Sequence, residues 1–373
     1  MNARVLDRTL IYGSAVVLAI WALIPFYLIA ISALTPQPNV SDYPKPLFPT
    51  SVVGSYAVPE WLANVKTDFF QRRVSRSVLD EIHLAALKSA VKDQELAGVD
   101  VVTDGEVRRD NSLDYFLVRL PGVDVDNPNK AYYLDFFPTV VRAEIAPEPL
   151  GLVDDFRLVS SLTGQRVKCT ITGAYSMLRR LRDEHYGDQR RLGLALAGVV
   201  NAELRRLQEA GCAFVQIDDE YIAGYPDDIT WAVELLNRCF EGIHVKKALH
   251  ICFGNRYGKP SWAGDYSYLA PAIFEAEIDQ LVLEFARRGQ ADLAIFRDTP
   301  PPFEIGLGVL DVKDWTVETP EVVAKRIIQA TSSVRGDKLW INPDCGLRHL
   351  SVDVARAKLQ AMVEGAKLAR ELV

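Results

Sequence analysis

The sequence predicts an α/β protein built as a (β/α)8 TIM barrel, in which eight parallel strands alternate with helices. Short apolar runs of strand length alternate with longer amphipathic stretches over about 320 residues. Unusual polar residues stand at the C-terminal end of nearly every run. In a barrel these ends form a ring and can build one site. In a doubly wound open sheet, which is the alternative, they would lie in a row and could not all meet.

The expected strands are the eight apolar runs, at residues 51–55, 99–106, 167–173, 213–220, 247–254, 280–286, 305–312 and 338–346. Helical stretches connect them, and two of these, at residues 75–98 and 188–211, end in glycine, as helices often do. A last helix is expected over residues 351–373, with Ser351 as its N-cap. Residues 109–159 are rich in aromatic residues and proline and lack clear periodicity. We interpret them as an insertion after the second strand that forms part of the substrate mouth.

A hydrophobic segment precedes the predicted barrel. Residues 10–34 form an uncharged apolar run that is long enough to cross a hydrocarbon layer of about 30 Å as a helix. Arg4 and Arg8 precede this run, so the positive-inside rule would leave the N-terminus in the cytoplasm. The segment resembles the first transmembrane helix of sugar ABC-transporter permease subunits. We therefore divide the chain into residues 1–47, a hydrophobic segment with a proline-rich connector, and residues 48–373, the barrel.

Charge and cysteine content restrict the possible functions. The net charge of −7 disfavours a nucleic-acid partner, which would require a basic surface. The five cysteines are odd in number and irregularly spaced, which disfavours a disulfide framework and fits reduced thiols in a cytosolic enzyme. Three of them are expected to be structural: Cys169, Cys212 and Cys239. A single span with a cytoplasmic N-terminus would instead put the barrel outside the cell, so the two interpretations conflict.

The reduced thiols lead us to expect a cytoplasmic catalytic domain. It is either anchored to the membrane through residues 10–34 or joined to them only by a fusion or a mis-assigned start.

Four residues at strand ends have the character of a zinc site: His250, Cys252, Glu284 and Cys345. His250 and Cys252 lie two positions apart, so in an extended chain their side chains point to the same side. Zinc held by nitrogen and sulfur is commonly tetrahedral, and a carboxylate such as that of Glu284 can supply an exchangeable fourth ligand. The set indicates a metal that activates a bound group. The alternative is that the cysteines are buried as small apolar residues, since a lone His-x-Cys pair is a weak signal.

Eight short motifs follow one another along the barrel: FPTSVVGSY, DGEVRR, TGAYSM, FVQIDDEY, HICFGN, LEFA, GLGVLDVK and NPDCGL. Their order and spacing resemble the C-terminal catalytic barrel of the cobalamin-independent methionine synthase family, from about Phe48 to the C-terminus. The resemblance implies a zinc-dependent methyltransferase of methionine biosynthesis, with zinc bound by the four residues named above. It also implies that homocysteine binds the zinc as a thiolate and takes the methyl group through its sulfur.

The resemblance further implies a binding site for the amino-acid part of homocysteine. Gly54 and Ser55 match positions that hold the carboxylate, and Glu106 and Asp218 match positions that pair with the ammonium group.

Each of these residues has a structural alternative. Ser55 could cap the helix that follows the first strand. Glu106 could pair with Arg108 or Arg109 on the barrel rim. The two acidic residues directly after Asp218 could be solvated loop charges.

Two departures from the family concern the methyl donor. The chain has no room for the second, N-terminal barrel that helps full-length members to bind polyglutamylated folate. Lys313 stands where the family has a histidine that supplies the proton to the leaving folate nitrogen. Lysine is a weaker acid unless burial lowers its pKa. Lys313 is therefore a candidate general acid, and the expected donor is either a methyl-folate or a methyl-corrinoid protein.

Two other functions stay open at this point. Relatives of the epoxyalkane:coenzyme M transferase type use the same zinc to open an epoxide with a different thiol. Glu106 and Asp218 favour an amino-acid thiol over coenzyme M, because a sulfonate would require a cationic pocket. The second alternative is a non-catalytic, membrane-tethered accessory protein, which the intact set of metal ligands disfavours.

Overall fold

The computed structural model describes residues 47–373 and the single residue 23. The span predicted at residues 10–34, with its likeness to a permease helix, lies outside the described residues except at that one position. Among the helices that are described, none combines the length and the apolar character that crossing a membrane requires.

The strands are, in chain order, β1 (Val101–Val102), β2 (Val123–Val125), β3 (Thr139–Val141), β4 (Arg166–Val167), β5 (Cys169–Thr172), β6 (Arg182–Asp183), β7 (Phe214–Asp218), β8 (Lys246–Ile251), β9 (Gln280–Leu283), β10 (Glu304–Leu310) and β11 (Leu339–Pro343). The α-helices are α3 (Glu60–Phe70), α4 (Arg76–Ala97), α5 (Asp114–Leu117), α6 (Leu152–Ser160), α7 (Ala174–Arg180), α8 (Gln189–Glu209), α9 (Ile229–Phe240), α10 (Ala294–Asp298), α11 (Pro320–Ala330) and α12 (Val352–Glu371). Short 3-10 helices are η1 (Glu220–Gly224), η2 (Pro226–Asp228), η3 (Tyr266–Leu269), η4 (Ala272–Glu275), η5 (Ala291–Leu293) and η6 (Gly336–Lys338).

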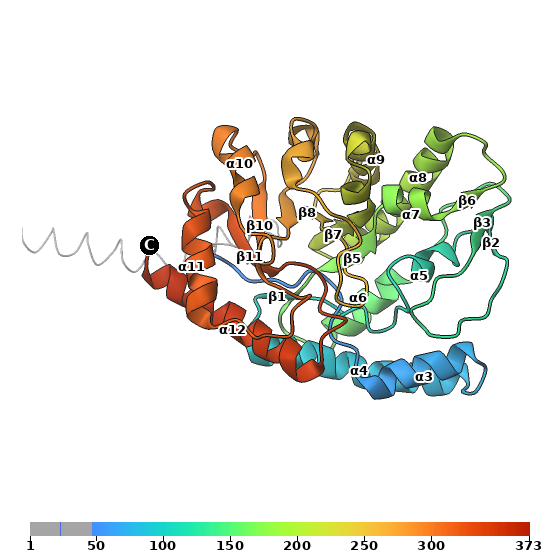
Figure 1. Cartoon of the computed structure of the whole chain (residues 1–373). Helices are drawn as coiled ribbons and strands as arrows, with labels where there is room; N and C mark the ends of the chain where they lie inside the picture. Colours follow the sequence, from blue (N-terminus) through green and yellow to red (C-terminus); the bar gives the residue numbers. More distant parts are fainter. Residues whose placement is uncertain (1–22, 24–46) are drawn as a thin grey trace, which may run out of the picture. The chain divides into compact units, whose positions relative to one another are not determined.

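The strands form the predicted parallel barrel. Six of them pair in the order β11-β10-β9-β8-β7-β5, and every pairing in this row is parallel. The ring is completed by β1 with β4 and by two bridges: Thr50, just before the first predicted run, pairs with Ile341, and Ser51, its first residue, pairs with Val101. The first strand of the barrel is thus reduced to two residues. Helices lie around the outside of the strands (Figure 1).

The long helices begin and end where the sequence predicts. Ser75 caps α4 by accepting a hydrogen bond from the backbone N–H of Val78, and Gly98 ends the helix in the left-handed conformation, with a φ of 83°. Ser351 caps α12 in the same way, as predicted, by accepting a hydrogen bond from the backbone N–H of Val354. The connection from β8 to β9 differs, because in the described chain it holds only the 3-10 helices η3 and η4.

The predicted insertion after the second strand is present. It contains α5, the antiparallel pair β2 and β3, and α6, and β3 pairs with β6 to complete a three-stranded sheet outside the barrel. The barrel strands β7 to β11 are buried almost throughout, which explains why their sequences are continuous apolar runs. Polar residues are therefore concentrated where these strands end.

Candidate active site

A pocket of about 320 Å³ lies at the carboxyl ends of the barrel strands. Seven of the nine predicted site residues line it: Gly54, Ser55, Glu106, Asp218, His250, Cys252 and Cys345. Glu284 and Lys313 are not among the lining residues. The predicted insertion contributes Asn111, Ser112, Leu134 and Phe136, so it does form part of the mouth of the pocket.

Three of the four predicted metal ligands come together. One ligand atom each from His250, Cys252 and Cys345 lies within 4.8 Å of the others, and the two sulfurs are 3.2 Å apart. The Nδ1 atom of His250 lies 3.1 Å from the carbonyl oxygen of Val282, which orients the ring. Its Nε2 atom is buried and has no hydrogen-bond partner among the described residues. A buried imidazole nitrogen without a partner, beside two thiols, is the donor set that zinc prefers.

The electrostatics of the cluster favour a thiolate. The hydrogen bond from Cys252 holds the pKa of the Cys345 thiol well below its usual value, and His250 acts in the same direction against the effect of burial. The three residues therefore share a negative charge that a divalent cation would neutralise.

Glu284 lies outside this three-residue group, because Lys313 holds its carboxylate. The Nζ atom of Lys313 lies 2.9 Å from Oε2 of Glu284, and both side chains are buried. The backbone N–H of Phe253 also approaches Oε2, at 3.3 Å, while Oε1 has no partner within the described part of the chain. Burial alone would lower the pKa of Lys313, but the neighbouring thiols and Glu284 raise it above its ordinary value.

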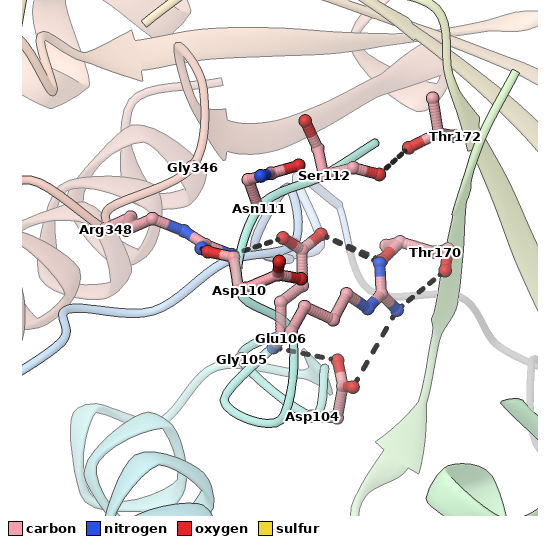
Figure 2. A network of polar contacts seen from close by, with 12 residues as sticks. Asp104, Gly105, Glu106, Asp110, Asn111, Ser112, Thr170, Thr172, Gly346 and Arg348 are labelled. Carbon is pink, nitrogen blue, oxygen red and sulfur yellow. Dashed lines mark hydrogen bonds and ion pairs between the residues drawn. The ribbon is translucent and has the colours of Figure 1, made fainter. Parts of the chain in front are cut away.

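Glu106 is the centre of an arginine-rich network (Figure 2). Its carboxylate lies 3.3 Å from Nη1 of Arg109 and 3.1 Å from Nη2 of Arg348, and it accepts a hydrogen bond from the Thr170 hydroxyl at 3.1 Å. The alternative pairing with Arg109 is therefore present, and Arg108 pairs with Asp155 instead. Two guanidinium groups already compensate the charge that was expected to attract an ammonium group.

Asp218 has a different environment. It ends β7, and its Oδ1 atom accepts a hydrogen bond from the Gln216 amide at 2.6 Å. No ion pair to Asp218 occurs in the part of the chain that the structure describes. Burial is the main cause that raises its pKa to about 7. Of the two predicted ammonium partners, Asp218 is the one whose charge is not already paired.

Gly54 and Ser55 bring the backbone close to the other site residues. A Cβ atom on Gly54 would lie 2.6 Å from Oε1 of Glu106, so only glycine fits there. The carbonyl of Ser55 accepts a hydrogen bond at 2.8 Å from the backbone N–H of Leu347, which is two residues after Cys345. Ser55 does not cap the next helix, because α3 begins after Pro59.

Other pocket residues were not found by the sequence reasoning. The interpretation of the two acidic residues after Asp218 as solvated loop charges is wrong. Asp219 is buried and accepts hydrogen bonds from the backbone and the hydroxyl of Ser176, and Glu220 lines the pocket. Arg348 also lines the pocket. The sequence signal that could have identified Arg348 is its position three residues after Cys345, in the loop that follows a barrel strand.

The comparisons with known proteins cover nearly the whole described chain. Residues 48–368 match the family described as "Cobalamin-independent synthase, Catalytic domain". A methionine synthase of Sulfurisphaera tokodaii is 34% identical over 329 residues, which cover 87% of this chain and 94% of the relative. A methionine synthase of Saccharolobus solfataricus is 36% identical, with 87% and 96% covered.

A solved structure shows the same fold. The B12-independent methionine synthase from Shewanella sp. W3-18-1, in complex with selenomethionine, superposes with a TM-score of 0.77 at 27% identity, covering 88% of this chain and 99% of that one. The fold, the ordered motifs and the convergence of the metal-ligand residues agree with these matches. This chain therefore belongs to the cobalamin-independent methionine synthase catalytic-domain family.

Proposed function

We propose that this protein is a methyltransferase that methylates the sulfur of homocysteine to give methionine. The observation that carries the proposal is the group His250, Cys252 and Cys345 in the wall of a pocket that also contains the unpaired carboxylate of Asp218. The curated relatives named methionine synthase, and the solved relative with selenomethionine, support the same reaction.

The metal that these residues would hold is zinc. His250 through Nε2, Cys252 and Cys345 would be three ligands, and Glu284, whose Oε1 is buried without a partner in the described chain, is the proposed fourth. When bound there, zinc would lower the pKa of a coordinated thiol, so that the thiol is a better nucleophile at neutral pH.

The residues of the pocket bind and orient the amino acid. Asp218 accepts hydrogen bonds from the substrate ammonium group, and the Ser55 hydroxyl with its neighbouring backbone binds the carboxylate. Glu106 contributes mainly by fixing Arg348, which lines the pocket, and it also pairs with the buried Arg109. The sulfur then attacks the methyl carbon of the donor, the carbon–donor bond breaks, and its electron pair leaves with the donor.

The donor is either a methyl-folate or a methyl-corrinoid protein. The leaving group of a methyl-folate requires a proton, and Lys313 as the general acid stays a prediction. Its raised pKa makes its ammonium group a weak acid, and its Nζ atom is committed to Glu284. These features favour a donor whose leaving group needs no proton from Lys313.

We also propose that residues 48–373 form the catalytic domain and that it works in the cytoplasm. The basis is the pair of free cysteines at the site, because free thiols persist in a reducing compartment. Anchoring through residues 10–34 is a separate question, which does not affect the chemistry of the pocket.

The test is a screen of thiols against donors with the zinc-loaded full-length protein. Homocysteine and coenzyme M are each offered methyltetrahydrofolate, a methyl-corrinoid donor and a small epoxide, and methionine formation is expected with homocysteine only. Cys252→Ser and Cys345→Ser should lose both zinc and activity, whereas Cys239→Ser, which changes a buried cysteine in α9, should keep both. Faster reaction of coenzyme M with the epoxide, or full zinc content in both site variants, would contradict the proposal.

A further inference from the structure

A second cavity, of about 510 Å³, shares no lining residue with the substrate pocket. Its walls come from α3, α4, the chain from Arg108 to Arg119, Phe137 and the start of α6. Four aromatic rings line it: Phe69, Phe70, Tyr115 and Phe137. Its volume is in the usual range for small-molecule sites, and its walls combine apolar rings with a few polar groups, as such sites do.

Lys66 of α3 places a buried amino group in this cavity. Its side chain is 2% exposed, and its Nζ atom donates to the carbonyl oxygen of Arg109 at 2.7 Å. Among the described residues, no carboxylate lies within ion-pair distance of Lys66, and the negative charges of Asp110 and Glu106 act on it from farther away. Burial lowers its pKa well below the usual value. The amino group of Lys66 thus makes one hydrogen bond, has donors left over and pairs with no carboxylate in the described chain.

His83 of α4 is the second buried polar group that lines this cavity. It is 4% exposed, and neither ring nitrogen has a hydrogen-bond partner in the described chain. Burial first, and then the nearby positive charge of Lys66, lower its pKa to about 3. Buried polar side chains are normally hydrogen-bonded. His83 is such an exception, and it lines the same cavity as Lys66, whose amino group makes one hydrogen bond and no ion pair within the described chain.

The acidic residues of the cavity do not supply the missing partners. Asp155 is engaged by Arg108 at 2.7 Å and by the Tyr115 hydroxyl at 2.8 Å. Asp110 pairs with Lys130, and Asp154 is exposed to solvent. The wall also carries Arg76, which pairs with Asp80 at 3.0 Å, and Arg119, which has no ion pair among the described residues, so the basic groups of the cavity are not all compensated.

We propose that this cavity is a second ligand site, for a small molecule with a carboxylate or phosphate group on an aromatic or apolar body. The anionic oxygens accept hydrogen bonds from Lys66 and from one N–H of His83, and the body packs against the phenylalanine rings. The site is independent of the methyl-transfer pocket. The two are nevertheless joined through one segment, because Lys66 holds the carbonyl of Arg109 while the Arg109 guanidinium holds Glu106.

The probes are phenylphosphate, benzoate, inorganic phosphate and the neutral benzyl alcohol, each titrated into the full-length protein. The protein contains five histidines, so the ring signals of ¹³C-labelled histidine can be resolved by NMR, and His83→Phe identifies the signal of His83. We expect phenylphosphate or benzoate to shift the His83 signal in a saturable way, with or without saturating homocysteine. Benzyl alcohol and inorganic phosphate, which each lack one half of the proposed ligand, should bind at least tenfold more weakly. Which of the two aromatic anions binds more tightly distinguishes a phosphate from a carboxylate ligand.

Lys66→Met should weaken binding of the aromatic anion at least tenfold. Lys88→Met removes the same charge from an exposed position on α4 and should leave it unchanged. The proposal is overturned if the His83 signal does not move, if homocysteine competes with the probe, or if Lys66→Met binds as tightly as the parent. If Lys66→Met does not fold, the comparison of phenylphosphate and benzoate with benzyl alcohol decides, and equal affinities would overturn the proposal.

Discussion

At the scale of single residues, the partner of a side chain decides what its charge can do. Glu106 and Asp218 are both acidic residues at strand ends, and both were predicted to bind an ammonium group. Glu106 is neutralised by Arg109, three residues away in the chain, and by Arg348, 242 positions away. The pairing with Arg109 could be considered from the sequence, but the pairing with Arg348 can be seen only in the folded structure. Asp218 accepts only an amide hydrogen bond among the described contacts.

This difference predicts opposite effects of two similar substitutions. Glu106→Gln leaves two buried guanidinium groups without their shared counter-ion, so the free energy of unfolding should fall by about 3–5 kcal/mol. Asp218→Asn keeps the fold, because it replaces a carboxyl whose charge is already disfavoured by burial. It should raise the KM for homocysteine strongly, since a lost charged contact costs about 2–5 kcal/mol.

The measurements are denaturant unfolding and steady-state kinetics of both variants. If Glu106→Gln is as stable as the parent and Asp218→Asn binds homocysteine normally, the assignment of the two carboxylates is wrong. The control is Ser332→Ala, which removes an exposed hydroxyl distant in sequence from both carboxylates. It should change neither the free energy of unfolding nor the KM for homocysteine.

At the scale of elements, one side chain connects the ends of two strands that precede predicted metal ligands. Asp344 follows β11 directly, and its carboxylate accepts three backbone N–H bonds, from Phe285 at 2.9 Å, Ala286 at 2.8 Å and Arg287 at 3.0 Å. Asp344 precedes Cys345, and the three donors follow Glu284. The side chain thereby fixes the spacing between two of the predicted ligands.

Asp344→Asn should disturb this junction, because an amide offers one acceptor where three donors converge. The expected loss of unfolding free energy is about 1–3 kcal/mol. Zinc affinity should fall about 10- to 100-fold, as for other residues that orient metal ligands. Both are measured by denaturant unfolding and by competition with a zinc chelator. Asp314→Asn, at an exposed position that accepts one backbone N–H, is the control and should change neither value.

The elements themselves were largely predictable, for physical reasons. Buried parallel strands are continuous apolar runs, and helices such as α4 and α12 carry N-cap residues that mark their starts. The first strand was predicted over residues 51–55 but contributes only the bridges at Thr50 and Ser51. An apolar run shows that a segment is buried, but it does not show how many of its residues pair with a neighbour.

At the scale of the whole molecule, barrel closure explains both the success and the limits of the site prediction. Closure brings the strand ends together, so His250, Cys252 and Cys345 could be expected to meet. The competition for Glu284 by Lys313 is a choice between side-chain contacts, which spacing cannot reveal. The second cavity was missed for a similar reason, because Lys66 and His83 read as ordinary residues of amphipathic helices. Only the packing shows that, within the described chain, His83 has no hydrogen-bond partner and Lys66 has no ion-pair partner.

Closure of the barrel also predicts the residue at which the folded domain begins. The carbonyl oxygens of Leu47 and Phe48 accept hydrogen bonds from Arg370 at 2.6 and 3.1 Å, Phe48 is fully buried, and the bridges of Thr50 and Ser51 close the ring. A fragment of residues 47–373 should therefore fold, bind one zinc and methylate homocysteine as the full-length protein does. A fragment of residues 53–373 loses these contacts and should unfold or bind zinc poorly. Thermal unfolding, metal analysis and the methylation assay compare the two fragments with the full chain. If the longer fragment loses zinc or activity, or the shorter one keeps both, the domain boundary proposed near residue 48 is wrong.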